Sequence, residues 1–176
     1  PSIIRRHVRG TRTLDFGCGA GRSTRYLKDL GFDSVGVDIS RPMLEEAQKR
    51  DPGGDYRLVG ESGPGDLKEA PFDLILSAFT FDNFPGLEER KNSLESMKNL
   101  LSEQGRIVNI VSAPEIYVNE WVSFSTRDYP ENKRAGSGDR VLIEILDVED
   151  SRPVEDTLCT DEDYNRLCRQ AELSLL

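Results

Sequence analysis

The sequence predicts an α/β fold in which helices cover both faces of a doubly wound, mostly parallel sheet. Short apolar runs alternate with helical patterns from residue 12 to residue 111. The run at residues 72–78, FDLILSA, is almost continuously apolar, as expected of a strand that is buried on both faces. A glycine-rich turn directly follows the first run. The chain has 176 residues, 36% of them hydrophobic, so we expect one domain over residues 1–176.

The elements follow one another at the spacing of strand–helix–strand units. The pattern predicts strands at residues 12–16, 34–37, 56–59, 72–78 and 106–111, and helices at residues 23–30, after Ser40, and at residues 87–101. Gly31 is typical of a helix end, and Ser40 followed by Pro42 is typical of a helix start. We expect Gly105 to close the turn before the fifth strand. Residues 12–111 therefore form the predicted sheet core.

The alternation breaks at Ser112. Residues 112–158 read as a segment inserted after the fifth strand, with a strand candidate at residues 140–148. The aromatic and acidic side chains of this segment could line a ligand pocket or pack an auxiliary strand, and both interpretations stay open; they are Glu115, Tyr117, Glu120, Trp121, Asp128 and Tyr129.

The last part of the chain, residues 159–176, is expected to hold the final helix and the opening of a sixth strand. Thr160 is a helix N-cap with Asp163 at the third helical position. Residues 173–176 resemble the first residues of a strand. The pattern thus predicts that the 176 residues are part of a longer chain.

The formal net charge of -9 predicts that nucleic acid is not a partner, because an acidic domain repels phosphates. The three cysteines, Cys18, Cys159 and Cys168, are widely spaced, which argues against a disulfide framework and a zinc site and favours the cytoplasm. No metal is expected. No apolar run approaches the ~20 residues of a membrane helix, so no membrane is expected. The oligomeric state stays open.

The glycine-rich turn TLDFGCGAGR indicates the class of ligand. A dinucleotide-binding turn reads GxGxxG, whereas here Gly17, Gly19 and Gly21 stand at every second position. Asp15 precedes the first glycine by two residues, where it would repel a pyrophosphate. The turn therefore favours a ligand that carries positive charge and no phosphate.

A second carboxylate supports that interpretation. Asp38 ends the second predicted strand, in VGVDIS, at the same edge of the sheet as the glycine turn. A carboxylate there can accept hydrogen bonds from both hydroxyls of a ribose. A nucleoside with a cationic tail fits both features, and S-adenosylmethionine is the candidate cofactor.

The combination of DxGxGxG, VGVDIS and FDLILSAF resembles the class I S-adenosylmethionine-dependent methyltransferases, whose fold is Rossmann-like. The resemblance covers residues 12–111. It implies that Asp15, Gly17 and Gly19 frame the methionine part of the cofactor, with the Gly17 carbonyl and nearby groups receiving its ammonium group. Cys18 is counted among the cofactor-binding residues, as a small side chain that fills the turn and not as a nucleophile.

The resemblance implies further cofactor contacts. Asp38 would hold the ribose, and Ile39 and Met43 would pack on the adenine, although Met43 could equally be core. Glu61 and Ser62 would meet the adenine amino group, with Asp66 as the competing position. Ser77 would face the cofactor from the other side, with Phe79 and Phe81 near the reactive methyl group.

The function implied is transfer of a methyl group from S-adenosylmethionine to a small-molecule acceptor by in-line displacement. The leaving thioether is neutral, so alignment and exclusion of water can supply the catalysis, and no catalytic residue stands out. The alternatives are a non-catalytic S-adenosylmethionine-binding regulatory module and a nicotinamide dehydrogenase, which the glycine order disfavours.

Overall fold

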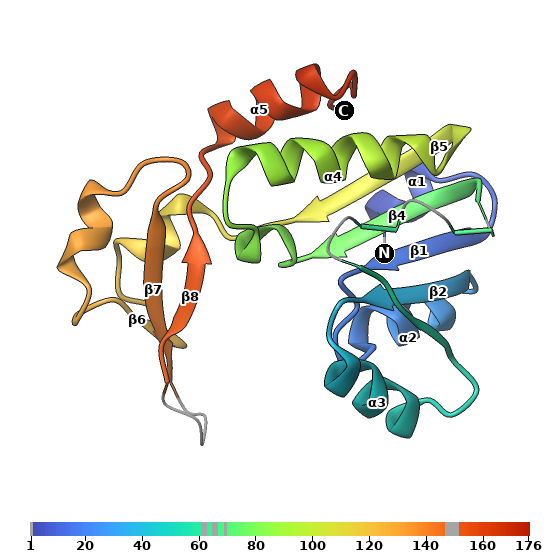
Figure 1. Cartoon of the computed structure of the whole chain (residues 1–176), viewed down its shortest axis with the longest axis horizontal. Helices are drawn as coiled ribbons and strands as arrows, with labels where there is room; N and C mark the ends of the chain where they lie inside the picture. Colours follow the sequence, from blue (N-terminus) through green and yellow to red (C-terminus); the bar gives the residue numbers. More distant parts are fainter. Residues whose placement is uncertain (1, 61–62, 65–66, 69, 147–151) are drawn as a thin grey trace. The chain divides into compact units, whose positions relative to one another are not determined.

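The structure is a computed structural model that describes residues 2–60, 63–64, 67–68, 70–146 and 152–176. The chain divides into two compact units (Figure 1). The first unit comprises the residues up to Thr80 together with Ser93–Ile110, and the second comprises Phe81–Asn92 and Val111–Leu176.

The first unit is built on a parallel sheet of five strands. They are β1 (Arg12–Phe16), β2 (Asp33–Asp38), β3 (Asp55–Leu58), β4 (Phe72–Ala78) and β5 (Leu101–Ile110). Their order is β3-β2-β1-β4-β5, and every neighbouring pair is parallel. This confirms the predicted mostly parallel, Rossmann-like α/β fold.

The helices of the first unit follow its strands. They are α1 (Ser2–His7), α2 (Arg22–Asp29) and α3 (Arg41–Arg50), whereas α4 (Leu87–Asn99) begins in the second unit and ends in the first. Ile4 and Val8 pack with Leu27 of α2 against Leu74 and Leu76 of β4. Ile75, between those two strand residues, is also fully buried on the opposite face. Burial on both faces explains why β4 is apolar throughout.

The predicted turn at Gly105 is wrong, because β5 begins at Leu101 and runs through this glycine. The pairing with β4 is irregular here: Phe72 pairs with Leu101, while Leu74 pairs with Arg106. A Cβ at Gly105 would lie 2.8 Å from the carbonyl oxygen of Phe72. The glycine therefore permits a close approach of two strands and does not end one.

The second unit contains a small antiparallel sheet. Its strands are β6 (Phe124–Ser125), β7 (Arg140–Ile145) and β8 (Val154–Thr157), and its short helices are η1 (Phe81–Asn83), η2 (Pro114–Tyr117) and η3 (Pro130–Arg134). Tyr117, Val141, Ile143 and Leu158 form its apolar core. That residues 112–158 are an insertion stays a prediction.

The chain ends with α5 (Asp161–Gln170). Thr160 caps this helix as predicted, because its side chain accepts a hydrogen bond from the Asp163 backbone nitrogen. Residues 173–176, expected to open a strand, form no regular structure. Leu176 is 86% exposed, and a strand requires a partner for its backbone groups. Among the described residues, no helix is long and apolar enough to cross a membrane.

Candidate functional site

The candidate site lies in the first unit, at the carboxyl ends of its strands. The strand order reverses between β1 and β4, which is where ligands bind in open parallel sheets. Phe16, the last residue of β1, pairs with Ser77 near the end of β4. The predicted cofactor residues on these strands are thus brought to one edge.

All three glycines of the turn adopt positive φ angles, 72° at Gly17, 51° at Gly19 and 74° at Gly21. Side chains are disfavoured there whatever the available space. A Cβ at Gly17 would overlap the side chain of Thr80, and one at Gly21 would lie 2.6 Å from the Tyr56 hydroxyl oxygen. The first and third glycines therefore accommodate neighbours within the protein.

Gly19 is different, because a Cβ there would approach only the terminal methyl of Met43, at 3.9 Å. The backbone of the turn is open at this glycine. Of the three positions, Gly19 is the one at which an external ligand could approach the main chain closely.

Asp15 is fully buried at the end of β1. Its Oδ2 accepts hydrogen bonds from the hydroxyls of Ser23 and Thr24 in α2, each at 2.6 Å. Its Oδ1 is buried without a hydrogen-bond partner. Burial raises the pKa of Asp15, the two hydroxyl hydrogen bonds lower it, and the nearby Asp38 carboxylate raises it again. A buried carboxylate with an unused oxygen fits a cationic ligand group.

Asp38, the last residue of β2, supports the backbone of the turn. Its Oδ2 accepts a hydrogen bond from the Gly19 nitrogen at 2.7 Å, and its Oδ1 accepts one from the Ser40 nitrogen at 2.8 Å. Each carboxylate oxygen retains a second lone pair. Ser40 precedes α3 as expected, but its side chain forms no cap hydrogen bond.

Apolar side chains lie exposed around the ends of β2 and β3. Ile39 is 63% exposed, Met43 is 47% exposed, and Leu58 is 46% exposed. The exposure of Met43 disfavours the core alternative for this residue. Leu58 has the same character but was not singled out from the sequence. Glu61, Ser62 and the competing Asp66 lie outside the described residues.

Ser77 and Cys18 are both buried. The Ser77 Oγ has no hydrogen-bond partner, so, like Asp15, this side chain has unused hydrogen-bonding capacity at the strand ends. Burial, followed by the Asp15 and Asp38 carboxylates, raises the pKa of Cys18 to about 12. Cys18 is therefore a neutral thiol at physiological pH, which agrees with its expected role as a small residue that fills the turn.

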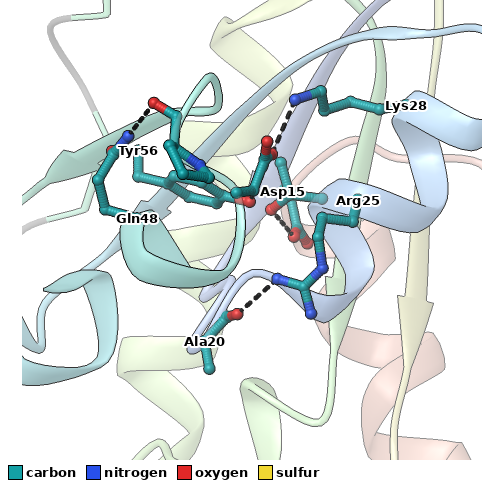
Figure 2. A network of polar contacts seen from close by, with 9 residues as sticks. Asp15, Ala20, Arg25, Lys28, Gln48 and Tyr56 are labelled. Atoms are coloured by element: carbon teal, nitrogen blue, oxygen red, sulfur yellow. Dashed lines mark hydrogen bonds and ion pairs between the residues drawn. The ribbon is translucent and has the colours of Figure 1, made fainter. Parts of the chain in front are cut away.

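Polar contacts from α2 and α3 hold this region together (Figure 2). Arg25 of α2 donates to the carbonyl oxygen of Ala20 in the turn, at 2.9 Å. Lys28, one turn later, forms an ion pair with Asp51 at 2.7 Å. The first contact fixes the turn to α2, and the second joins α2 to the residue that follows α3.

Three hydroxyl residues near the glycine turn were not predicted from the sequence. Ser23 and Thr24 hold Asp15, and Thr80 donates from its Oγ1 to the carbonyl oxygen of Phe16, at 3.0 Å, and more weakly to that of Gly17, at 3.4 Å. Ser23 and Thr24 stand two and three residues after Gly21, and this position was the available signal. Thr80 is 63 residues from Gly17 in sequence, so only the fold reveals that contact.

The two phenylalanines after β4 have different environments. Phe79 is 56% exposed and has a positive φ of 62°. Phe81 is fully buried and packs edge-on against Phe84, with ring centroids 5.0 Å apart. The Phe79 side chain is thus largely exposed, whereas Phe81 is part of a core.

The second unit holds a separate buried polar cluster, which we call the Arg90 cluster: Asp82, Arg90, Tyr117, Asp156 and Tyr164. Arg90 is fully buried and donates to the carbonyl oxygens of Phe81, at 3.1 Å, and Thr157, at 2.5 Å. This arginine therefore links η1 to β8.

The two carboxylates of the Arg90 cluster accept hydrogen bonds, whereas the buried Tyr164 hydroxyl has no hydrogen-bond partner. Asp82 accepts from the Ser112 nitrogen at 3.0 Å, and Asp156 accepts from the Tyr117 hydroxyl at 3.0 Å. Burial raises the pKa of both carboxyl groups, and the charge of Arg90 lowers it. Tyr117 thus packs the small sheet, which favours the packing alternative for this residue. No cluster of three or more metal-ligating side chains occurs in the described part of the chain.

A family described as a methyltransferase domain matches residues 14–109. The chain is 46% identical over 65 residues to the 18S rRNA (guanine-N(7))-methyltransferase of Bos taurus, covering 36% of this chain and 23% of that protein. It is 30% identical over 101 residues to the demethylmenaquinone methyltransferase of Renibacterium salmoninarum, covering 57% and 41% respectively. The matched segments thus span less than half of these relatives.

Solved structures share the fold. An S-adenosylmethionine-dependent methyltransferase from Clostridium acetobutylicum superposes with a TM-score of 0.71 at 17% identity, covering 99% of this chain and 78% of that one. S-adenosylmethionine-bound CalS10, an amino pentose methyltransferase from Micromonospora echinaspora, superposes with a TM-score of 0.68 at 22% identity, covering 96% and 77%.

The exclusion of nucleic acid as a partner is wrong. The bovine relative acts on rRNA, so proteins similar to this chain include one with a nucleic-acid acceptor. The physical reason is that net charge averages over a whole surface, while a nucleic acid responds to local charge. Here the exposed Arg5, Arg6 and His7 gather in the last turn of α1 although the whole chain carries -9.

Proposed function

Because the chain belongs to the class I S-adenosylmethionine-dependent methyltransferases, we propose that it transfers a methyl group from S-adenosylmethionine to an acceptor by in-line displacement. The single observation that carries this proposal is the pair of carboxylates at neighbouring strand ends: Asp15, with a buried unused oxygen, and Asp38. When bound, the cofactor supplies a sulfonium-activated methyl group.

Asp38 would hold the ribose. Its two oxygens already fix the Gly19 and Ser40 nitrogens, so the carboxylate is held in one orientation before the ligand arrives. The second lone pair on each oxygen can accept from a ribose hydroxyl. Each such charge-assisted hydrogen bond contributes roughly 1.5 to 3 kcal/mol net.

Asp15 and the Gly17 carbonyl would receive the methionine ammonium group. The orphaned Oδ1 of Asp15 supports this role, because a buried anion without a partner gains most from a cation. Ser77, whose Oγ is also without a partner, would contribute from the β4 side.

The exposed apolar side chains would hold the adenine. Ile39 directly follows Asp38, and Met43 lies in α3. Leu58 is the last residue of the neighbouring strand β3. An adenine ring packed among them would remove their exposed surface from water, which is favourable by about 25 cal/mol per Å². Glu61 and Ser62 remain the proposed partners of the adenine amino group.

Catalysis would come mainly from alignment. The thioether leaves without charge, so no group of the protein needs to protonate it. Well-oriented reactions gain ~7 to 11 kcal/mol from positioning and avoided solvent reorganisation. A base is needed only when the acceptor arrives protonated.

We assign recognition of the acceptor to the second unit, within residues 112–158. Exposed side chains there include Trp121, at 49%, and Val122, at 93%. The relatives act on acceptors as different as rRNA and demethylmenaquinone. An assay for the acceptor therefore includes RNA as well as small molecules.

Calorimetric titration with S-adenosylmethionine and S-adenosylhomocysteine tests the cofactor. We expect binding of both, and expect Asp38→Ala to weaken both more than tenfold, equivalent to ~1.4 kcal/mol or more. Asp33→Ala is the matched control, because Asp33 is the exposed first residue of the same strand. Absence of binding by the wild-type protein at millimolar ligand would overturn the proposal.

Methyl transfer itself is tested with S-adenosylmethionine labelled in the methyl group. The acceptor panel contains ribosomal RNA, quinol precursors and small amines, and the readout is label recovered in the acceptor. Transfer to any of them establishes catalysis and identifies its class. A cell extract serves as a further source of acceptors. If the protein binds the cofactor but transfers no label to the panel or to the extract, the regulatory-module alternative is favoured.

The cytoplasm remains our proposed compartment. Cys18, Cys159 and Cys168 are all free thiols, and a reducing environment keeps thiols in this state. Fractionation of cells that express the native gene tests this assignment.

A further inference from the structure

We propose that the exposed basic side chains at the end of α1 bind the phosphates of single-stranded RNA. We call this surface the α1 patch and define it by four residues: Arg5, Arg6, His7 and Arg9. The patch directly precedes β1, whose carboxyl end contributes to the proposed cofactor site. The inference rests on the proposed function for its biological reason, which is to hold an RNA acceptor on the enzyme.

The sequence concentrates positive charge before β1. Residues 1–14 contain four arginines and no acidic residue, although the net charge of the chain is -9. The first acidic residue is Asp15, and its side chain is fully buried. This segment therefore carries a local charge opposite in sign to that of the whole chain, and a polyanion responds to local charge.

Arg12, the fourth arginine, is left out of the α1 patch because two aspartates lie next to it. Its backbone nitrogen donates to the Oδ2 of Asp73 at 3.1 Å, and it pairs in register with Asp33 of β2. These carboxylates offset positive charge at the start of β1. The attraction for phosphate is therefore assigned to the residues that precede Arg12.

The side chains of the α1 patch are exposed and unpaired. All four residues are exposed, and none of them forms an ion pair or a side-chain hydrogen bond in the part of the chain that the structure describes. By contrast, Lys28 pairs with Asp51, and Arg50 pairs with Glu46. Guanidinium groups without a partner are available to phosphates, which they bind in bidentate geometry.

The core of the first unit holds the α1 patch in place. Ile4 and Val8 are each 8% exposed and pack in one cluster with Leu74 and Leu76 of β4. Cations in the last turn of a helix also stabilise the helix dipole. Arg9 follows α1 and has no such role, so the dipole does not account for the whole patch.

The α1 patch fits an RNA better than it fits a lipid surface. A helix that lies on a membrane presents a broad apolar face to the lipid. The helix α1 has six residues, and its Ile4 side chain is buried in the core, which leaves Ile3, at 67%, as its exposed apolar side chain. The exposed surface of α1 is therefore dominated by charge.

The small size of the patch favours a single strand over a duplex. Duplex DNA stays stiff over about 150 base pairs and carries one charge per ~1.7 Å, so it would press many phosphates against a domain of net charge -9. A flexible single strand can place a few phosphates on the patch while the rest turns away from the acidic surface. Single-stranded segments are also the form in which proteins recognise RNA bases.

A single strand held at the α1 patch can extend to the carboxyl ends of the strands. The five residues of β1 span about 17 Å. Phosphates about 3.4 Å apart cover that length with roughly five nucleotides. The patch therefore suits a long acceptor, because a small molecule bound at the carboxyl ends would not reach it.

The test measures the fluorescence anisotropy of a labelled single-stranded RNA of about 15 nucleotides over a range of salt concentrations, without cofactor. We expect a variant that combines Arg5→Gln, Arg6→Gln and Arg9→Gln to bind about tenfold more weakly at low salt. The slope of log affinity against log salt should fall by about 2, because each of three phosphate contacts contributes ~0.7. The corresponding triple lysine variant keeps the charge and should keep the slope.

The matched control combines Lys28→Gln, Lys49→Gln and Arg50→Gln. It removes the same charge from exposed positions whose cations are already paired with carboxylates, so the slope should fall by less than half as much. Calorimetric titration with S-adenosylmethionine checks the folding of all variants, and its affinity should be unchanged because the α1 patch precedes β1.

Three results would overturn this inference. They are no binding of RNA by the wild-type protein at low salt, equal losses in the glutamine variant and its matched control, and tighter patch-dependent binding of duplex DNA, single-stranded DNA, polyglutamate or phosphatidylglycerol vesicles than of the RNA. Each of these leaves the proposed function standing. Failure of the wild-type protein to bind S-adenosylmethionine would instead overturn the proposed function, and RNA binding measured without cofactor would show which of the two had failed.

Discussion

The two units of the molecule both bury carboxylates, but they surround them differently. In the first unit the charge that acts on Asp15 is a second carboxylate, Asp38, and one Asp15 oxygen has no partner. In the second unit the charge of Arg90 acts on both Asp82 and Asp156. A buried carboxylate that lacks a cation indicates a ligand site, whereas one near a buried cation indicates a structural role.

The difference has an energetic basis. Burying an ionised group costs free energy that only a counter-charge or strong hydrogen bonds can offset. The Arg90 cluster supplies both from within the chain. At Asp15 two hydroxyls offset part of the cost, and a cationic ligand would offset the rest. Substitutions in the two units should therefore affect different properties.

The largest effect is expected at Arg90. Arg90→Met removes a buried cation that donates to two carbonyl oxygens and leaves Asp82 and Asp156 without its charge. We expect a loss of about 3 to 5 kcal/mol in the free energy of unfolding, measured by urea denaturation. Arg140→Met is the control: Arg140 pairs with Glu155 but is 73% exposed, so the loss should stay below about 1 kcal/mol. Similar losses in both variants would contradict a special role for Arg90.

A smaller effect, on binding and not on stability, is expected at Asp15. Asp15→Asn removes a buried charge with an unpaired oxygen, so the free energy of unfolding at pH 7 should stay within about 1 kcal/mol of the wild type. The affinity for S-adenosylmethionine should fall more than tenfold, or ~1.4 kcal/mol, because the ammonium group loses its counter-charge. The opposite result would be a destabilised Asp15→Asn variant whose folded fraction binds S-adenosylmethionine as tightly as the wild type. That result would contradict the assignment of a binding role to Asp15 and a structural role to the Arg90 cluster.

The smallest effect is a change in pH dependence at Asp82. Burial raises the pKa of this carboxyl group, so the folded state holds the proton more tightly than the unfolded state. The stabilisation is complete below the unfolded pKa and is lost as pH rises through the folded pKa. Asp82→Asn should remove this loss, which amounts to at most about 1.4 kcal/mol per pH unit in that window.

Asp163 gives a control of opposite sign. Hydrogen bonds from Ser137 and Thr160 lower the pKa of its carboxyl group. Its contribution is present above the unfolded pKa and is lost as pH falls, so Asp163→Asn should flatten the acid side of the stability profile. Urea denaturation from pH 3 to pH 8 measures both variants. Parallel profiles for the wild type and Asp82→Asn would contradict the assigned shift.

Much of the first unit could be predicted from the sequence because its signals are local. The boundaries of β1 and β4 match the predicted ranges, since apolar runs bounded by turn residues define buried strands. The turn at Gly17–Gly21 was recognised from spacing alone. The predicted turn at Gly105 was wrong. A close approach of two strands requires glycine just as a tight turn does, so the sequence alone does not distinguish the two.

The second unit was harder to predict because its contacts join residues that are far apart. Arg90 bonds to Thr157, 67 residues later, and Tyr117 bonds to Asp156, 39 residues later. Nothing in the helical pattern of residues 87–101 distinguished Arg90 from its exposed neighbours. A buried arginine is recognisable only once the elements that cover it are in place.

The parallel sheet, the glycine turn and the two carboxylates at its strand ends follow from local patterns in the sequence. Periodic burial and the need for glycine at positive φ angles involve only a few consecutive residues, so a short stretch of sequence is enough to recognise them. The tertiary structure alone decided that Thr80 occupies the space beside Gly17, that Phe79 is strained and exposed, and that one oxygen of Asp15 stays unpaired. Those features depend on which distant side chains meet, and the packing of the folded chain decides that.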